Sequence, residues 1–254
     1  MELKKIKQPF FFFALPLVLV FVTGILSPAC SKNHATITNP VNNPPISTDS
    51  MANSSNKTYL ALGDSYTIGT SVTEADRYPV QTTTILKVQG INMSGTEIIA
   101  TNGWTTADLM NAVNTRPATD TFDVVSLLIG VNNQYQGRTL TEYKQQFTTL
   151  LQRSIQFAKN KPSHVFVISI PDYSVTPFAR GRNLKEIAAE IDMFNDANKT
   201  IADSYKVNYL YITDESRKAA NDPSLIASDS LHFSGKEYEV WSYKLAPMMK
   251  AVLQ

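Results

Sequence analysis

A serine stands where the chain is expected to turn from a strand into a helix. Ser65 follows Gly63 and Asp64, directly after the apolar run Tyr59–Leu62. Such a turn presents the hydroxyl above the edge of a sheet, and glycine two residues earlier permits a tight backbone. The triplet alone also suits an ordinary capped turn, because average residue usage produces it by chance in roughly one chain in twenty of this size. Other residues must therefore support the interpretation of Ser65 as a nucleophile.

A base for that hydroxyl can be found among the histidines. Histidine suits this task because its unperturbed pKa lies near neutrality. The chain has three histidines. His34 lies in a polar N-terminal segment and His164 opens an apolar run at what should be the far end of a sheet, which leaves His232. Asp229, three residues upstream in the same segment, can orient that base.

Two more polar segments could supply donors for an oxyanion. Thr101–Trp104 and Gly130–Asn133 each follow an apolar run. The backbone amides of Ser65 and Gly103 and the side chain of Asn132 could converge on a developing negative charge. With Ser65, His232 and Asp229, this is the set of groups that hydrolysis by a serine nucleophile requires.

The elements that must position these residues follow from the hydrophobic pattern. Nearly continuous apolar runs are typical of parallel strands covered on both faces. The predicted strands are Tyr59–Leu62, Glu97–Ala100, Val124–Ile129, Val165–Ile170 and Val207–Ile212. Helical periodicity predicts helices over 80–88, 106–113, 143–158, 184–205 and 236–252. Alternating strands and helices indicate a doubly wound α/β fold, in which chemistry lies beyond the carboxyl ends of the strands.

The four polar segments, in this order, resemble the conserved blocks of the SGNH, or GDSL-type, serine hydrolases. The resemblance runs from about Lys57 to the C-terminus. It implies a three-layer α/β sandwich with a parallel sheet of about five strands, as in flavodoxin-like folds. It also implies Ser65, Gly103, Asn132 and His232 as the name-giving residues, with Asp229 completing a triad. The chain departs from the family at Tyr66, where leucine is commoner, and at Asn133, where aspartate is frequent.

The activity that the resemblance implies is hydrolysis of carboxylic esters through an acyl-enzyme, without a cofactor. The expected substrate is a small-molecule ester whose acyl group belongs to a lipid, a short-chain compound or a glycan. An acyltransferase or a thioesterase would use the same residues, and products formed with an added acceptor would reveal transfer. A non-catalytic binding protein on this fold should lack a triad residue, and none is missing.

Aromatic side chains in the neighbouring loops are candidates for a substrate pocket. Trp104, Tyr135 and Tyr173 should border the site together with Tyr66, and Phe178 lies in the same loop region as Tyr173. They could line an acyl pocket, stack on a sugar or only pack the loops. No metal is expected, because no cluster of His, Cys or Asp has the spacing of ligands.

Residues 1–56 do not show the alternation of strands and helices that the rest of the chain shows. A basic start at Lys4 precedes the uncharged stretch Phe10–Leu26, typical of an export signal or an uncleaved anchor. Cys30, the only cysteine, follows small residues and resembles the lipidated cysteine of bacterial lipoproteins, although the usual leucine is displaced by one position; a stray thiol is the alternative. Residues 31–56 are rich in Asn, Ser, Thr and Pro and should form a disordered tether.

This organisation predicts a protein held on a membrane outside the cytoplasm. The expected parts are a signal segment (1–30), a tether (31–56) and a hydrolase domain (57–254). A lipid on Cys30 would provide the membrane anchor. The net charge of +1 and the absence of a basic stripe argue against a nucleic-acid partner.

Overall fold

The computed structural model describes residues 56–117 and 119–254. The expected signal segment, the lipidation site at Cys30 and nearly all of the expected tether lie outside the described residues. No helix among those described is both long and apolar enough to cross a membrane.

Five parallel strands form one sheet with the order β2-β1-β3-β4-β5. Their chain order places β1 at the point where the winding reverses, as in doubly wound sheets. The strands are β1 Lys57–Gly63, β2 Met93–Ala100, β3 Val124–Leu128, β4 Val165–Ile168 and β5 Asn208–Leu210. Every residue of β3 and β4 is buried, which explains why these runs are apolar without alternation.

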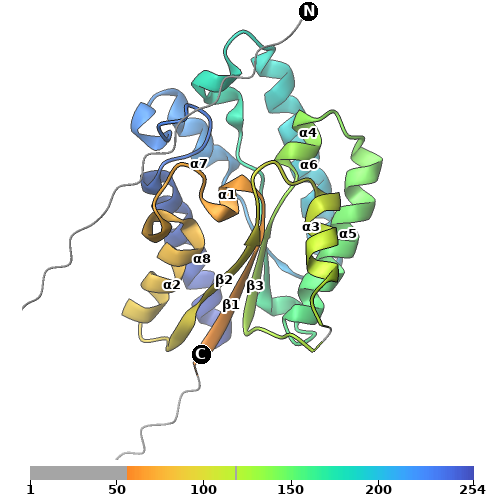
Figure 1. The fold of residues 1–254 in the computed structure, drawn as a ribbon, viewed down its shortest axis with the longest axis vertical. Coiled ribbons are helices and arrows are strands. Elements are labelled where there is room, and N and C mark those ends of the chain that lie inside the picture. The colour runs from red at the N-terminus through yellow and green to blue at the C-terminus, as the bar shows by residue number, and fades with distance from the viewer. Residues whose placement is uncertain (1–55, 118) are drawn as a thin grey trace, which may run out of the picture. The chain divides into compact units, whose positions relative to one another are not determined.

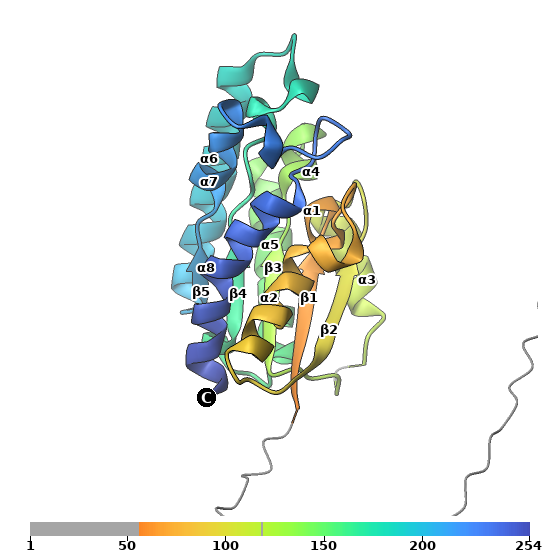
Figure 2. The same cartoon turned by 90° about the vertical axis from the view of Figure 1, so that its left-hand side faces the viewer.

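Helices cover both faces of this sheet and make the outer layers of a three-layer sandwich (Figure 1). Helices α2 and α8 pack together on one face, and α3, α5 and α6 pack on the other (Figure 2). The longer helices are α2 Tyr78–Val88, α3 Thr106–Asn114, α5 Leu140–Phe157, α6 Leu184–Ser204 and α8 Gly235–Leu253. The predicted fold class is confirmed.

Helix α5 shows why the periodicity was informative. Thr139 caps its first turn by accepting the N–H of Glu142, and the buried residues recur at offsets of three and four. These buried residues are Tyr143, Phe147, Leu150, Leu151, Ser154 and Phe157. One face of the helix thus joins the core while the other meets solvent.

Three short helices were not among those that the periodicity predicted, although the turn at Ser65 was expected to lead into a helix. They are α1 Ser65–Ile68, α4 Val131–Tyr135 and α7 Thr213–Arg217. With four or five residues each, they are too short to show a helical period. Helices α1 and α4 follow β1 and β3, and they carry Ser65 and Asn132.

The strand register brings the polar segments to one edge of the sheet. Gly63, the last residue of β1, pairs with Ala100 of β2 on one side and Leu128 of β3 on the other. Because parallel strands that end level release their loops at the same edge, the loops carrying Ser65 and Gly103 start side by side.

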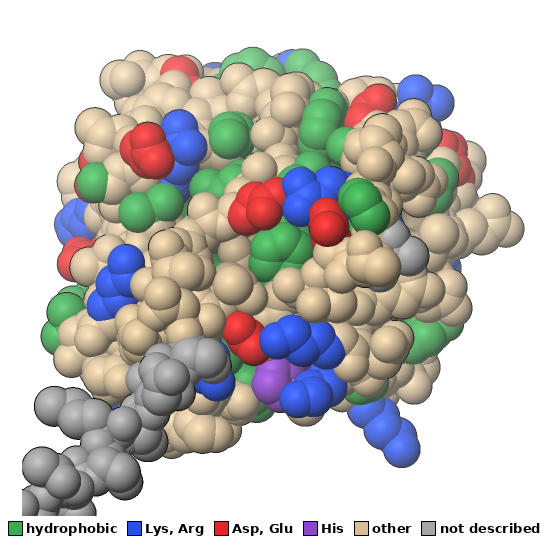
Figure 3. Space-filling view, turned by 60° about the horizontal axis from the view of Figure 1, so that its bottom comes forward, with side chains coloured by type: hydrophobic (Ala, Val, Ile, Leu, Met, Phe, Trp, Pro, Cys, Tyr) green, Lys and Arg blue, Asp and Glu red, His purple; other side chains and the backbone are tan. Residues whose placement is uncertain are grey.

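His164 lies directly before β4, at the opposite end of the sheet. The face of the molecule at that end carries charged side chains of both signs (Figure 3). His164 Nδ1 lies 2.6 Å from the carbonyl oxygen of Asp123, and the Asp123 carboxylate accepts from Lys159 Nζ at 2.7 Å. Asp123 also accepts from the backbone N–H of Thr58, at the start of β1. His164 therefore lies at the amino ends of the strands, away from Ser65.

Candidate active site

The turn that carries Ser65 is shaped by the residues on either side of it. Asp64 caps α1, because its Oδ1 accepts the N–H of Tyr66 at 3.0 Å. Gly63 is required by close packing, since a Cβ there would overlap the Thr67 hydroxyl and approach the Leu128 carbonyl oxygen to 2.5 Å. Ser65 follows as the first residue of α1 and is 5% exposed.

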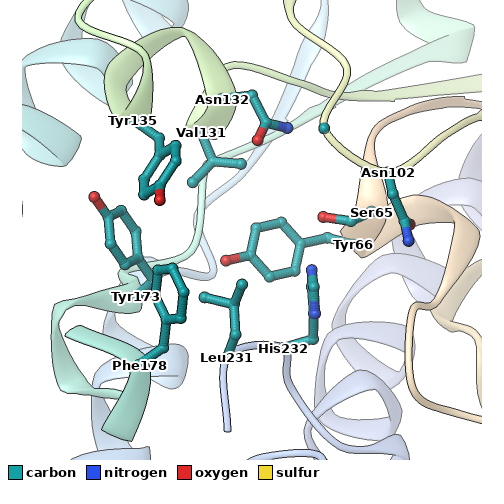
Figure 4. A pocket seen from close by; sticks show the side chains of 11 residues that line it. Ser65, Tyr66, Asn102, Val131, Asn132, Tyr135, Tyr173, Phe178, Leu231 and His232 are labelled. Carbon is teal, nitrogen blue, oxygen red and sulfur yellow. The ribbon is translucent and has the colours of Figure 1, made fainter. Parts of the chain in front are cut away.

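The histidine and the aspartate are arranged as a pair within one loop. His232 Nδ1 lies 2.6 Å from Asp229 Oδ2, and Asp229 Oδ1 accepts the N–H groups of Leu231 and His232, each at 2.9 Å. A carboxylate oxygen only accepts, so Nδ1 carries the proton and Nε2 is left as an acceptor. The imidazole points toward the Ser65 hydroxyl (Figure 4). The three side chains thus have the geometry of a serine, base and orienting acid.

Ser71 is a part of this arrangement that the sequence did not reveal. Its Oγ donates to Asp229 Oδ2 at 2.6 Å, the same oxygen that faces the imidazole. The preceding residue, Thr70, donates its hydroxyl to the side-chain oxygen of Asn102. The turn that follows α1, at Thr70 and Ser71, is therefore hydrogen-bonded both to Asp229 and to the loop that holds Gly103.

The surroundings of Asp229 keep it ionised. Partial burial alone would raise its pKa, but the hydrogen bonds from Ser71, from the Leu231 N–H and from His232 hold the pKa of this carboxyl well below its usual range. Asp229 is therefore an anion throughout the neutral range. A permanent negative charge is what a base needs beside it when it accepts a proton.

Backbone donors for an oxyanion are present at two positions. The N–H groups of Ser65 and Gly103 donate to no acceptor among the described residues. Both residues line the same cavity. These two amides remain free to bind a developing negative charge there.

A third donor comes from Asn132 on α4. Its Nδ2 donates to the Trp104 carbonyl oxygen at 2.9 Å, which fixes the amide and leaves its second hydrogen free. Gly130 precedes α4 with φ 136°, and a Cβ there would come within 2.7 Å of Ile170 and Tyr143. Glycine at this position therefore allows the helix to start where Asn132 faces the site.

A cavity of about 270 Å³ contains these groups. It has Ser65, His232 and the candidate oxyanion donors at one end and an aromatic cluster at the other (Figure 4). The lining residues are Ser65, Tyr66, Asn102, Gly103, Val131, Asn132, Tyr135, Tyr173, Phe178, Leu231 and His232. Asp229 lies behind His232 and does not line the cavity. The structure thus brings the predicted hydrolytic residues to one place.

The aromatic residues expected around the site are divided by the structure. Tyr66, Tyr135 and Tyr173 line the cavity, and so does Phe178. Trp104 is not among the lining residues; its indole is partly buried against the core, and its carbonyl oxygen holds Asn132. Its contribution to the site is thus made by the backbone.

Asn133 serves to connect two elements. Its amide nitrogen donates to the Thr106 hydroxyl at 2.7 Å, and its oxygen accepts the Thr106 N–H at 3.0 Å. The side chain is fully buried and does not line the cavity. This departure from the family pattern therefore ties α4 to the start of α3. Among the described residues, no group of three or more His, Cys, Asp or Glu side chains could hold a metal ion.

Comparison with known proteins agrees with this site. Residues 61–240 match the model of the GDSL-like lipase/acylhydrolase family, which is more than half of the chain. The family match, on this α/β fold, identifies the chain as an ester hydrolase. The chain belongs to the GDSL-like lipase/acylhydrolase family. A search of curated protein sequences finds no match.

Solved structures with the same fold have low sequence identity to this chain. A lipase/acylhydrolase from Enterococcus faecalis has a TM-score of 0.61 at 15% identity, covering 77% of this chain and 96% of that one. The psychrotrophic esterase EstA from Pseudoalteromonas sp. scores 0.59 at 14% identity, with coverage of 77% and 98%. The acetyl xylan esterase AlAXEase scores 0.59 at 16% identity, with coverage of 74% and 97%. At these identities the likeness shows the fold.

Proposed function

We propose that the protein hydrolyses carboxylic esters through an acyl-enzyme on Ser65. The observation that carries this proposal is the arrangement at one end of the cavity. There Ser65 faces His232, whose Nδ1 lies 2.6 Å from Asp229, and free donors from three residues surround the same space. This set of groups performs acyl transfer in serine hydrolases.

The reaction follows from the positions of these groups. His232 Nε2 takes the proton of Ser65 as its oxygen attacks the ester carbonyl, and the oxyanion binds the N–H groups of Ser65 and Gly103 and the Asn132 amide. His232 then gives its proton to the leaving alcohol as the C–O bond breaks. Water, deprotonated by the same imidazole, attacks the acyl-enzyme and releases the acid and the free serine.

The cavity favours an ester whose acyl group is small or whose chain extends past the mouth. About 270 Å³ accommodates a short acyl group and part of an alcohol. Proteins with this fold include an acetyl xylan esterase and a lipase/acylhydrolase. The proposed substrate class is a short-chain, lipid or glycan acyl ester, and an ester panel of increasing acyl length tests it.

The nucleophile is tested by labelling and substitution together. Ser65→Ala should remove nearly all ester hydrolysis, because no other group can form the acyl-enzyme. A serine-directed organophosphonate should label one site in the wild type, located by peptide mass spectrometry, and none in the variant. Ser204→Ala, at the end of α6, is the matched control and should keep full activity and labelling. Hydrolysis that survives Ser65→Ala would reject the proposal.

The oxyanion donors are tested at Asn132. Asn132→Ala should lower kcat by roughly 10²–10³ with a smaller change in KM, because the donor acts mainly on the transition state. Gln136→Ala, just after α4, removes an exposed amide that reaches only the Gly103 carbonyl oxygen and should change kcat little. Equal rates for the wild type and Asn132→Ala would remove Asn132 from the mechanism.

The place of action is proposed from the sequence of the N-terminal part. A basic start, an uncharged apolar stretch and Cys30 support an exported lipoprotein, tethered to the membrane on the side away from the cytoplasm. In a bacterial host that lipidates exported proteins, the full chain should fractionate with membranes, and Cys30→Ala should release it or block its processing. Wild-type protein that is soluble and begins after Cys30 would exclude the lipid anchor.

A further inference from the structure

The cavity contains a polar atom that the hydrolytic mechanism does not use. Tyr66 is 2% exposed and lines the cavity. Its phenol ring extends away from Ser65, and its hydroxyl points toward Tyr135, Tyr173 and Phe178 (Figure 4). The ring is held from behind, edge-on to His232 at 5.5 Å between centroids and against Phe233 at 5.9 Å. The position of the hydroxyl is therefore fixed by packing.

The Tyr66 hydroxyl has no hydrogen-bond partner among the described residues. Its backbone N–H donates to Asp64, and its contacts with neighbouring side chains are ring contacts. Among the other buried tyrosines, the Tyr59 hydroxyl bonds to Ser126 at 2.7 Å and the Tyr143 hydroxyl donates to the Ile129 carbonyl oxygen at 3.1 Å. The Tyr238 hydroxyl also lacks a partner among the described residues, but it lies in the core and does not line the cavity. A buried phenol with an unpaired hydroxyl that opens into a cavity indicates a partner outside the chain.

The Tyr66 phenol is protonated, so its hydroxyl can donate a hydrogen bond as well as accept one. Burial, followed by the nearby charge of Asp64, raises the pKa of Tyr66 well above its ordinary value. The hydroxyl therefore keeps its proton throughout the neutral range. A neutral phenol can donate to a carbonyl oxygen and can both donate to and accept from an alcohol.

The surrounding walls determine what such a partner must look like. Val131, Leu231 and the ring of Phe178 are apolar, so most of the bound group must be apolar too. A plain alkyl chain that filled this space would remove water from the Tyr66 hydroxyl and leave it without a partner, which is unfavourable. An oxygen placed a few atoms from the scissile carbonyl would satisfy it.

We propose that Tyr66 is a specificity-determining residue that binds a hydroxyl or carbonyl oxygen of the substrate, so that oxygen-substituted esters are preferred over plain alkyl esters. This inference rests on the proposed ester hydrolysis at Ser65. The oxygen can belong to the acyl chain or to the alcohol, because both groups of an ester bound at Ser65 enter the same cavity. The preference and its loss on removal of the Tyr66 hydroxyl are the measurable consequences.

The test compares matched pairs of esters in two arms. In the acyl arm, p-nitrophenyl 3-hydroxybutyrate is compared with p-nitrophenyl butyrate; in the alcohol arm, glycerol monobutyrate is compared with propyl butyrate. The wild type should favour the oxygen-bearing member of one pair by about tenfold or more in kcat/KM, and the arm in which this occurs identifies the source of the oxygen. Sites that hydrogen-bond a substrate hydroxyl discriminate strongly against analogues that lack it.

The Tyr66 hydroxyl is then removed by Tyr66→Phe, which keeps the ring. The ratio of kcat/KM within the favoured pair should fall close to one. Tyr78→Phe is the matched control, because Tyr78 is also fully buried but lies outside the cavity, with its hydroxyl near Thr67 and Ser126. The control should keep the wild-type ratio.

Several outcomes would overturn the inference. It is wrong if the wild type shows no preference in either arm, or if Tyr66→Phe keeps the preference. Its failure differs from failure of the proposed function, because Ser65-dependent hydrolysis of plain esters without a Tyr66-dependent preference rejects this inference alone. Absence of Ser65-dependent hydrolysis of any ester in the panel rejects both.

Discussion

Two aspartates near Ser65, Asp64 and Asp229, differ in how deeply they are buried and in how many hydrogen bonds they accept. The nucleophile turn, Gly63–Tyr66, buries Asp64 completely, and only its Oδ1 has a hydrogen-bond partner among the described residues. The acid loop, Asp229–His232, leaves Asp229 partly exposed and surrounds it with donors. Burial raises the pKa of Asp64 to about 7, whereas hydrogen bonds hold that of Asp229 well below its usual range despite its own partial burial.

This difference shows how the chain assigns separate tasks to two identical side chains. An acid that is only partly ionised near neutrality is a poor partner for an imidazolium, and a fully ionised acid is a good one. Asp64 therefore caps α1 and supports the turn, while in the proposed mechanism Asp229 supplies the charge. Under the proposed mechanism, the environment, more than the distance in sequence from Ser65, determines which aspartate would take part in catalysis.

Removing the negative charge of Asp229 should have the largest effect on kcat. Asp229→Asn should lower kcat by up to about 10⁴, because the amide cannot stabilise the imidazolium and allows the wrong tautomer of His232. Steady-state hydrolysis of one short-chain ester measures this. Asp222→Asn is the matched control; this partly exposed aspartate caps the short helix Pro223–Leu225, and the variant should keep its rate within a few-fold. A loss of less than tenfold for Asp229→Asn would remove the distinction between the two loops.

Removing one of the side chains that donate to Asp229 should have an intermediate effect on kcat. Ser71→Gly deletes the hydroxyl that holds Asp229 Oδ2 and should lower kcat by about tenfold with little change in KM, because a hydrogen bond to a charged group contributes about 1.5–3 kcal/mol. Glycine suits the backbone here, since Ser71 has φ 66°. Kinetics together with a thermal melt separate this positioning role from a loss of folding.

Ser230 provides the control for that substitution. It is also a serine with positive φ, at 67°, and it lies in the acid loop itself. Its carbonyl oxygen accepts the N–H of Phe178, a bond that Ser230→Gly retains. Ser230→Gly should keep kcat. Equal losses in both variants would mean that loop conformation, not the Ser71 hydroxyl, supports Asp229.

The effect expected in the nucleophile turn is on stability. Because the pKa of Asp64 rises from an ordinary 3.8 to about 7 on folding, the folded protein retains a proton that the unfolded chain loses. The stability from this group is present in acid and is lost as pH rises from about 4 to 7, with a slope approaching about 1.4 kcal/mol per pH unit. Asp64→Asn, which can still cap α1, should reduce that loss in urea unfolding measured across this range.

The contribution of Glu237 to the pH dependence of stability must be measured in the same experiment. Burial raises its pKa to about 7 as well, although Trp241 Nε1 donates to it at 2.7 Å. Each of Asp64→Asn and Glu237→Gln should remove part of the pH dependence, and the double variant should remove both parts. A slope for Asp64→Asn equal to that of the wild type would show that Asp64 is ionised in the folded protein.

The sequence allowed a good prediction of the fold because the longer elements are strongly patterned. Strands β3 and β4 are buried throughout, and α5 and α6 bury one stripe each, so their periods are visible in the residues. The short helices α1 and α4 lack such a pattern, because a single helical turn contains no repeat.

The site was predictable where its chemistry requires a rare residue type and was missed where it uses common ones. His232 stood out because only three histidines exist. Ser71 did not, since serine is common in loops and its partner Asp229 is 158 residues away in the chain. Tyr66 was expected to border the pocket, but the role now proposed for its hydroxyl was hidden, because the direction of the hydroxyl depends on packing against Phe233 and His232.

The acid loop has a consequence for motion around the site. Asp229 binds the backbone and the imidazole of His232 within four consecutive residues, so the acid and the base form one locally folded unit. A shift of this loop during substrate entry would carry both residues together and change the gap between His232 and Ser65 without disturbing the pair itself.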